Sequence, residues 1–309
     1  MTGWCVYDDQ VADPQHVAAV IDRRPEVVRW FVSIDRWVRG AAMTVDWSGR
    51  VGAALDAIAA SGSRLVVQLQ MKRPDWTAGD ADNTVGCAAW RQSRTEGWLS
   101  EAAVPLWCRF VERLAAELDR RNIVAWWGCW NEPDWRLDWP WRRPRYSNAS
   151  APVTPWTEGR LFGLFPIPPS APFGWSGGAA KLTGLRQRFP ELTWTSDGVG
   201  AGSAEWLAAV AADPTIGVID VHTYHGRNLA DVIGWSRQIV HAFDDARTER
   251  LPIVVGEYGD HSSDGTPVTP EWRDRLYVTE AALESEWPGR VVGVATHVQG
   301  ARYPALWQV

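Results

Sequence analysis

The sequence predicts an α/β protein, a (β/α)8 TIM barrel formed by residues 1–309 as a single domain. Eight apolar, β-branched runs recur along the chain, and a helical segment separates each run from the next. Runs that are apolar on both faces are typical of parallel strands joined by right-handed helical crossovers. A length of 309 residues is sufficient for one closed barrel.

Each expected strand is rich in valine, isoleucine, leucine or aromatic residues and ends at a turn signal. The eight runs are GWCVYDD (3–9), EVVRWFVSID (26–35), RLVVQLQ (64–70), IVAWWGCWNEP (123–133), LTWTSDG (192–198), GVIDVHTYH (217–225), LPIVVGEYG (251–259) and RVVGVATHVQ (290–299).

Helices are expected between these strands. Asp13 and Pro14 supply an N-cap and a proline at the first position of a helix that continues to about Arg24. The following helical segments span about 47–60, 99–121 and 179–189, and one more lies between each later pair of strands. A doubly wound open sheet is the alternative fold, but the first strand is not followed by a glycine-rich phosphate turn.

Two connections are unusually long, 71–97 after the third strand and 134–175 after the fourth. In a barrel, both lie on the face formed by the carboxyl ends of the strands. Active sites of this fold are built on that face.

Composition excludes several partners. The net charge of -6 argues against nucleic acid, which is usually bound by a basic face. No apolar run is long enough for a membrane span, and the first residues have no signal-peptide pattern. Localisation stays open between cytoplasm and a mature secreted form, and so does the oligomeric state. The sequence gives no sign of a cofactor.

The four cysteines have no metal-binding or redox spacing, so free thiols are expected, with one disulfide possible. Tryptophan is the outlier of the composition, with 22 residues against 6 tyrosines and 7 phenylalanines. This excess suggests flat surfaces for stacking.

Two glutamates end expected strands on opposite sides of the barrel. Glu132 closes the fourth strand after Asn131, and Glu257 lies near the end of the seventh. Both carboxylates would then face one small volume over the barrel mouth. Glycoside hydrolysis needs two such carboxylates, one as proton donor and one as nucleophile or base.

Three motifs at strand ends resemble the retaining glycoside hydrolases of clan A: WNEP on the fourth strand, VHTYH on the sixth and GEYG on the seventh. The order of elements follows that clan over nearly the whole chain. Features of family 39 (WNEPD, LTWTSDGVG) and of family 5 (VVRW, the pair His222 and Tyr224) occur together.

The resemblance implies a role for each matching residue. Glu132 would be the acid/base, Glu257 the nucleophile and Asn131 a partner of the sugar 2-hydroxyl. Tyr224 would bond to the nucleophile. His222 would support the site, and Arg29 would keep Glu257 charged.

The chain departs from the clan at two strand ends. LQMK replaces the histidine of family 5 after the third strand, so Gln70 or Lys72 would substitute. THVQG stands where the clan commonly has a tryptophan, so His297, Gln299 or Trp307 would cover that position.

Some residues keep two interpretations. His222 and His225 are either supporting residues or ordinary barrel residues, and they make a weak metal pair. The acidic residues Asp8, Asp9 and Asp35 suit solvation as well as sugar contacts.

Trp126 and Trp127 are expected to be partly core, because consecutive strand residues face opposite ways. Trp135, Trp139 and Trp141 in the long loop are expected to bind substrate. The indole rings near Glu132 are expected to desolvate it, which favours a proton donor.

The sequence thus predicts a retaining glycosidase of carbohydrate metabolism that acts on a β-linked oligo- or polysaccharide, with endo action expected. Exo action and a catalytically inactive carbohydrate-binding barrel are the alternatives.

Overall fold

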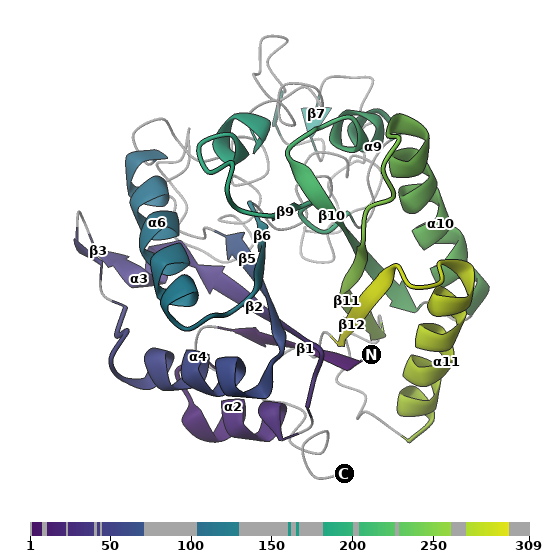
Figure 1. The fold of residues 1–309 in the computed structure, drawn as a ribbon. Helices are drawn as coiled ribbons and strands as arrows, with labels where there is room; N and C mark the ends of the chain where they lie inside the picture. Colours follow the sequence, from purple (N-terminus) through teal and green to yellow (C-terminus); the bar gives the residue numbers. More distant parts are fainter. Residues whose placement is uncertain are drawn as a thin grey trace.

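The computed structural model of the protein contains a closed barrel of parallel strands (Figure 1). The residues that it describes are 2–7, 11–22, 24–39, 42–43, 45–70, 104–129, 160–161, 165–166, 182–199, 204–225, 229–260 and 270–296.

Eight strands close the barrel, and each is parallel to both of its neighbours. In ring order they are β1 (Thr2–Tyr7), β2 (Val27–Ser33), β5 (Arg64–Gln70), β6 (Ala125–Gly128), β9 (Trp194–Thr195), β10 (Ile216–His225), β11 (Ile253–Asp260) and β12 (Val291–Thr296). Every expected strand is present in the expected order, so the predicted fold class is confirmed.

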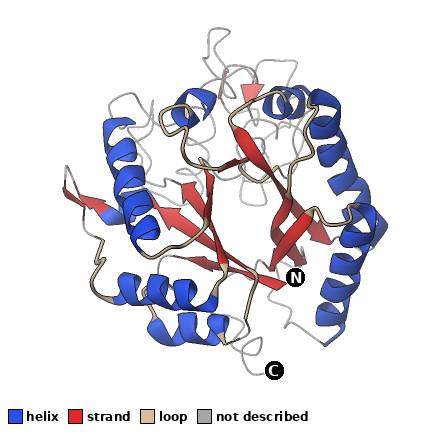
Figure 2. Ribbon diagram, viewed as in Figure 1, coloured by secondary structure: helices blue, strands red, loops and turns tan. Residues whose placement is uncertain are grey.

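Helices surround the strands (Figure 2). The helices are α2 (Pro14–Ile21), α3 (Ile34–Trp37), α4 (Arg50–Ser61), α6 (Val104–Arg120), α9 (Ala204–Ala211), α10 (Leu229–Ala246) and α11 (Pro270–Glu286), with a further helical turn at 182–186. Two short hairpins accompany them: β3 (Val38–Arg39) with β4 (Ala42–Met43), and β7 (Arg160–Leu161) with β8 (Phe165–Pro166). None of the described helices has the length and apolar character needed to cross a membrane.

The start of α2 follows the prediction, but its end does not. The Asp13 side chain accepts a hydrogen bond from the Gln15 N–H, and Pro14 is at the first helical position. The helix ends at Ile21, before the predicted Arg24, which has a positive φ of 51°. Pro25 follows, and a residue before proline is disfavoured in helical conformation.

Strand β6 is shorter than its sequence suggests. Its pairing ends at Gly128, and Cys129 is the last described residue of this segment. The predicted strand end with Asn131 and Glu132 lies outside the described residues. The long connections 71–97 and 134–175 also lie outside them, apart from β7 and β8.

The barrel lumen has an apolar floor. Val27, Val66, Trp126, Val218 and Val254 form a buried cluster separate from the larger core between strands and helices. These residues come from five different barrel strands and alternate with residues that face the helices. The floor fills the lumen near the amino ends of the strands. The polar side chains of the lumen lie beyond it, toward the carboxyl ends.

The larger core contains a group of indole rings. Trp194 stacks on Trp107 with ring centroids 6.2 Å apart, and Trp127 meets Trp194 edge-on at 6.3 Å. Trp127 belongs to this larger core and Trp126 to the lumen floor, so the two rings face opposite ways, and both are buried. Their prediction as core residues is confirmed. Trp127 packs in the barrel wall and Trp126 in the lumen floor, and neither ring offers a surface for sugars.

Candidate active site

Glu257 lies on β11 beside His222 of β10. The two residues are partners in the strand register, and His222 Nδ1 is 3.4 Å from Glu257 Oε1. Glu257 is only 3% exposed, and His222 is 1% exposed. Two predicted site residues are thus adjacent at the carboxyl-end half of the barrel.

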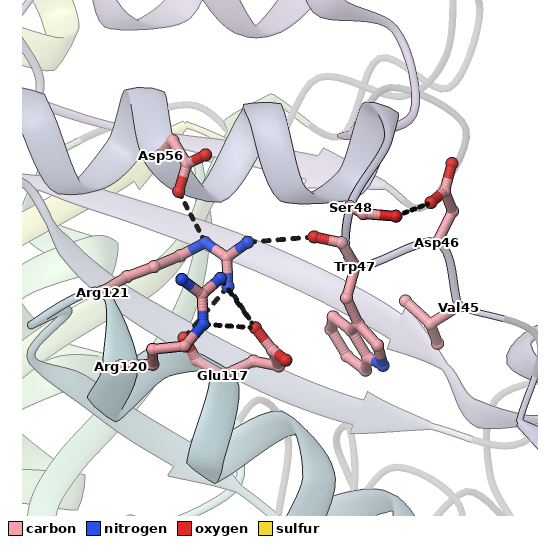
Figure 3. Close-up of a pocket in the computed structure, with 8 residues that line it drawn as sticks. All are labelled: Val45, Asp46, Trp47, Ser48, Asp56, Glu117, Arg120 and Arg121. Carbon is pink, nitrogen blue, oxygen red and sulfur yellow. Dashed lines mark hydrogen bonds and ion pairs between the residues drawn. The ribbon is translucent and has the colours of Figure 1, made fainter.

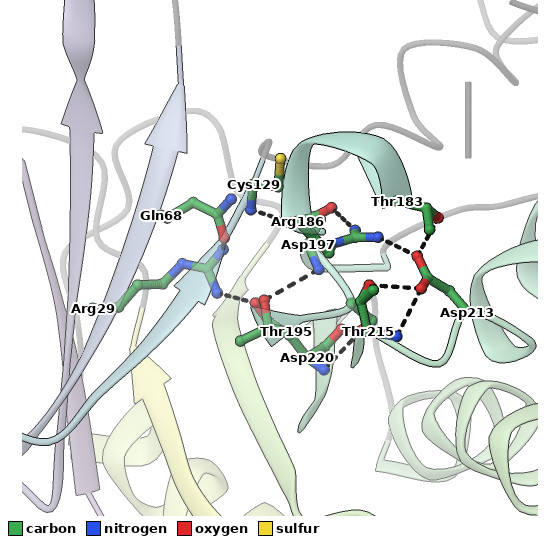
Figure 4. Close-up of polar contacts among 11 residues, drawn as sticks. Arg29, Gln68, Cys129, Thr183, Arg186, Thr195, Asp197, Asp213, Thr215 and Asp220 are labelled. Atoms are coloured by element: carbon green, nitrogen blue, oxygen red, sulfur yellow. Dashed lines mark hydrogen bonds and ion pairs between the residues drawn. The ribbon is translucent and has the colours of Figure 1, made fainter. Parts of the chain in front are cut away.

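Arg29 reaches across the lumen from β2 to β10. Its Nη1 donates to Asp220 Oδ2 over 2.7 Å, and its Nη2 donates to Gln68 Oε1 over 2.7 Å (Figure 4). Strands β2 and β10 are not neighbours in the ring, so the Arg29–Asp220 contact can only pass through the interior.

Asp220 links Arg29 to the strand that bears Glu257. Its Oδ1 accepts a hydrogen bond from the Gly256 N–H at 3.1 Å and lies 3.8 Å from His222 Nε2. We call Arg29, Gln68, Asp220, His222 and Glu257 the Arg29 cluster. Because Gly256 precedes Glu257, the cluster fixes the backbone at the carboxylate.

Glycines leave the space that the Arg29 cluster occupies. A Cβ at Gly256 would lie 1.7 Å from Arg29 Nη1, and one at Gly128 would lie 2.3 Å from Gln68 Oε1. Both contacts are impossible, so any larger residue would displace the polar side chains.

The charges of the cluster are mutually dependent. Burial lowers the pKa of Arg29, but the negative charges of Asp220 and Glu257 outweigh burial, and the net pKa lies above its ordinary value. Burial raises the pKa of the nearby Cys5 thiol well above its usual range, so this cysteine stays protonated. Its Sγ donates to the Gly256 carbonyl at 3.3 Å.

A second buried cluster joins the helical turn at 182–186 to the residues that follow β9 and those that precede β10. Arg186 donates to Asp197 Oδ2 and, over 2.6 Å, to Asp213 Oδ2 (Figure 4). The other Asp197 oxygen, Oδ1, accepts a hydrogen bond from the Cys129 N–H at the end of β6. We call Arg186, Asp197 and Asp213 the Arg186 cluster.

In the Arg186 cluster, both terminal nitrogens of the arginine are paired with carboxylates. Asp213 also accepts hydrogen bonds from the hydroxyls of Thr183 and Thr215 and from the Thr215 N–H. Burial raises the pKa of Asp213, but the charge of Arg186 and these hydrogen bonds lower it by a larger amount. The net pKa is therefore below its ordinary value.

Three predicted site residues can be located in full. Arg29, His222 and Glu257 come together in the Arg29 cluster. Tyr224 lies on β10 with its backbone paired to Gly259, but its side chain is outside the described part of the chain. The remaining predicted site residues lie outside the described residues: Asn131, Glu132, Trp135, Trp139, Trp141 and His297.

Sequence reasoning missed Asp220, Gln68 and Asp197. The first two stand inside apolar strands, where a polar residue facing the lumen is a signal that could have been used. Asp197 precedes a glycine in LTWTSDG, which signalled a turn but not a buried ion pair.

The described cysteines Cys5, Cys108 and Cys129 are free thiols. Within the described residues, no group of three histidine, cysteine, aspartate or glutamate side chains is arranged to hold a metal ion.

A shallow surface pocket of about 490 Å³ lies between α4 and the end of α6, away from both clusters (Figure 3). Its guanidinium groups are already paired, since Arg121 bonds to Asp56 over 2.7 Å and to Glu117. It offers no nucleophile or proton donor in an apolar setting, so it is a poor candidate for catalysis.

No protein-family model and no curated protein sequence matches the chain. Solved structures do match its fold. A GH5-4 broad-specificity endoglucanase from an uncultured bacterium is 15% identical with a TM-score of 0.52, and the match covers 93% of this chain and 76% of that one.

Two further structures agree with this match. A GH30 endoxylanase from Clostridium papyrosolvens is 9% identical with a TM-score of 0.55 and coverages of 98% and 66%. An endo-1,4-beta-mannanase from Rhizomucor miehei is 14% identical with a TM-score of 0.52 and coverages of 96% and 85%. The chain therefore shares the (β/α)8 barrel fold of these glycoside hydrolases.

Proposed function

We propose that the chain is a retaining glycoside hydrolase that cleaves β-linked oligo- or polysaccharide by double displacement. Glu257 is the nucleophile and Glu132 the acid/base. The observation that carries the proposal is the buried Glu257 carboxylate on β11, next to His222 and above the Arg29–Asp220 pair.

The surroundings of Glu257 suit a nucleophile. A carboxylate attacks an anomeric carbon only in its charged form, and a neighbouring guanidinium favours that form. Arg29 interacts with Glu257 through charge, and Asp220 holds the guanidinium in place. His222 at 3.4 Å limits how far the carboxylate can turn.

The fold comparisons favour the same reaction class. The similar structures are named as an endoglucanase, an endoxylanase and a mannanase, all of which act within β-linked polysaccharides. We therefore include endo action in the proposal. The whole of residues 1–309 is proposed to form one catalytic domain.

The remaining predicted residues have proposed roles on the substrate. Asn131 bonds to the sugar 2-hydroxyl, and Tyr224 bonds to the nucleophile. Aromatic rings in the long loop stack on sugar faces, where CH groups meet the negative π surface. These rings are Trp135, Trp139 and Trp141, and His297 contributes from the end of β12.

A substrate screen with product analysis tests the reaction. The enzyme is incubated with plant, fungal and bacterial polysaccharides and with aryl β-glycosides, and NMR records the anomer that forms first. Retention requires a β product and a separation of ~5 to 5.5 Å between the Glu132 and Glu257 carboxyls in a crystal structure. An α product with a separation of ~6.5 to 9.5 Å would mean an inverting enzyme.

The nucleophile is identified by trapping. With an active aryl glycoside whose 2-hydroxyl is replaced by fluorine, the oxocarbenium-like transition states are destabilised, and a good leaving group lets the first step outrun the second. The sugar then accumulates on the enzyme, and peptide mass spectrometry should find it on Glu257. Binding of polysaccharide without turnover or trapping would support the carbohydrate-binding barrel instead.

A further inference from the structure

The backbone at the end of β6 is held by a side chain instead of by the next strand. Trp127 N–H donates to the Thr193 carbonyl over 2.9 Å, as expected for a parallel ladder between β6 and β9. Donors on one edge of a strand come from every second residue, so the next is Cys129 N–H. That group donates to the Asp197 carboxylate. A carboxylate thus continues the ladder where β6 and β9 separate.

The local backbone turns Asp197 toward β6. Asp197 has a φ of 67° and Gly198 a φ of 73°, so two consecutive residues are left-handed. Aspartate and asparagine tolerate this conformation better than other residues with a side chain. A Cβ at Gly198 would lie 2.1 Å from His222 Nε2, so the same turn also packs against the Arg29 cluster.

The Asp197 carboxylate is fixed at its other oxygen by Arg186, which is itself held by Asp213. Asp197 is 0% exposed and Arg186 is 1% exposed, so water does not compete for these bonds. A charged acceptor makes a stronger hydrogen bond to a backbone N–H than a neutral one does. The cluster is therefore a rigid support for the residue at which the chain leaves β6.

We propose that Asp197 is a positioning residue for the acid/base Glu132, through its bond to the Cys129 N–H. The inference rests on the proposed function. Glu132 follows Cys129 by three residues, and a general acid must lie within hydrogen-bond reach of the glycosidic oxygen. Releasing the Cys129 N–H lets this segment shift, and a shift of 1 Å in a catalytic group can cost about 100-fold in rate.

The kinetic test uses aryl β-glycosides of one active sugar with leaving phenols of different acidity. Asp197→Asn keeps the backbone preference of position 197 but removes the charge. We expect kcat/KM to fall about 10- to 100-fold for phenol, which needs protonation, and less than about 3-fold for 2,4-dinitrophenol, which does not. In a Glu132→Gln background, Asp197→Asn should add no further sensitivity to the leaving group.

Asp213→Asn is the matched control. It removes the other carboxylate of the same arginine without touching the Cys129 N–H. It should lower thermal stability as Asp197→Asn does, but it should change kcat/KM by the same factor for every leaving group. If Asp197→Asn does not fold, Arg186→Lys weakens the same support and should give the same selective loss at smaller size.

Hydrogen exchange supplies a readout that needs no activity. The exchange rate of the Cys129 N–H can be followed in a peptide spanning 125–133. Relative to wild type, this rate should be at least about 10-fold faster in Asp197→Asn and unchanged in Asp213→Asn. A wild-type enzyme without turnover on any substrate would overturn the proposed function. Two results with an active wild-type enzyme would overturn this inference alone. In one, Asp197→Asn lowers kcat/KM equally for all leaving groups, and in the other, it leaves the exchange rate of the Cys129 N–H unchanged.

Discussion

Arg29 and Arg186 are both buried, and each is coupled to two carboxylates, yet the two clusters use their charges differently. Arg186 donates directly to both of its partners, Asp197 and Asp213. Arg29 donates to Asp220 and to the neutral Gln68 amide, and interacts with Glu257 through charge. The contrast suggests that a carboxylate occupied by strong donors can hold a backbone, whereas a nucleophile needs a stabilising charge that leaves an oxygen for substrate.

Removing the Glu257 carboxylate should have the largest effect. Glu257→Ala should reduce turnover of every substrate by more than about 10⁴-fold, because no covalent intermediate can form. Initial rates on an aryl glycoside and on polysaccharide measure this loss. Asp213→Asn, which alters a carboxylate of the Arg186 cluster, should retain turnover. Comparable losses in both variants would remove the distinction between the clusters.

Removing the proposed acid/base should have a smaller, substrate-dependent effect. Glu132→Ala should leave the first step nearly intact for an activated aryl glycoside and slow the second step, so that glycosyl-enzyme accumulates. Azide should restore the rate and give a β-glycosyl azide, which NMR identifies. Rescue of Glu257→Ala by azide with an α product, while Glu132→Ala stays inert, would show that the two roles are exchanged.

Replacing either arginine by methionine should destabilise the protein by about 3 to 5 kcal/mol, because each change leaves a buried carboxylate without its partner. Urea denaturation measures this free energy of unfolding. The activities of the folded variants should differ. On a dinitrophenyl glycoside, Arg29→Met should lower kcat/KM about 100-fold, and Arg186→Met by less than about 3-fold. Equal losses would mean that Arg29, like Arg186, acts only on structure.

The tryptophans after β6 should affect polysaccharide more than stability. Replacing Trp135, Trp139 or Trp141 by alanine should weaken polysaccharide turnover about 10-fold and leave Tm nearly unchanged, since exposed aromatic residues contribute little to a core. The control is Trp194→Ala in the barrel wall, which should cost about 3 to 5 kcal/mol of stability. A large drop in Tm with unchanged kinetics would assign the loop residues to packing.

Glu280 on α11 is a buried carboxyl outside both arginine clusters, and its effect should be the smallest. Burial, with a contribution from the charge of Glu26, raises the pKa of Glu280 from 4.5 to about 7. The folded state therefore keeps a proton that the unfolded state releases, and stability should fall as pH rises from about 4.5 to about 7. The slope should be at most about 1 kcal/mol per pH unit.

Glu280→Gln should flatten this dependence, which urea unfolding at pH 5, 6 and 7 would measure. An unchanged slope in the variant would assign the pH dependence to other groups.

The sequence predicted the fold better than it predicted the interior contacts. The apolar runs and their spacing were enough to predict all eight strands, because a strand that is buried on both faces can be recognised by its apolar composition. The alternation of Trp126 and Trp127 followed from strand geometry. The Arg29–Asp220 and Arg186–Asp197 pairs could not be predicted, since they depend on which strands face one another and on the left-handed turn at Asp197. The site prediction for Glu132 and its loop stays a prediction.

The reach of Arg29 across the lumen bears on how the chain acquires its structure during synthesis. Arg29 and Asp220 are separated by 191 positions, so the guanidinium emerges from the ribosome long before its partner. A fragment that ends before β10 would place a buried cation in an incomplete barrel without Asp220 to compensate it. We therefore expect amino-terminal fragments to stay unfolded until β10 is complete, so that the barrel forms as one cooperative unit.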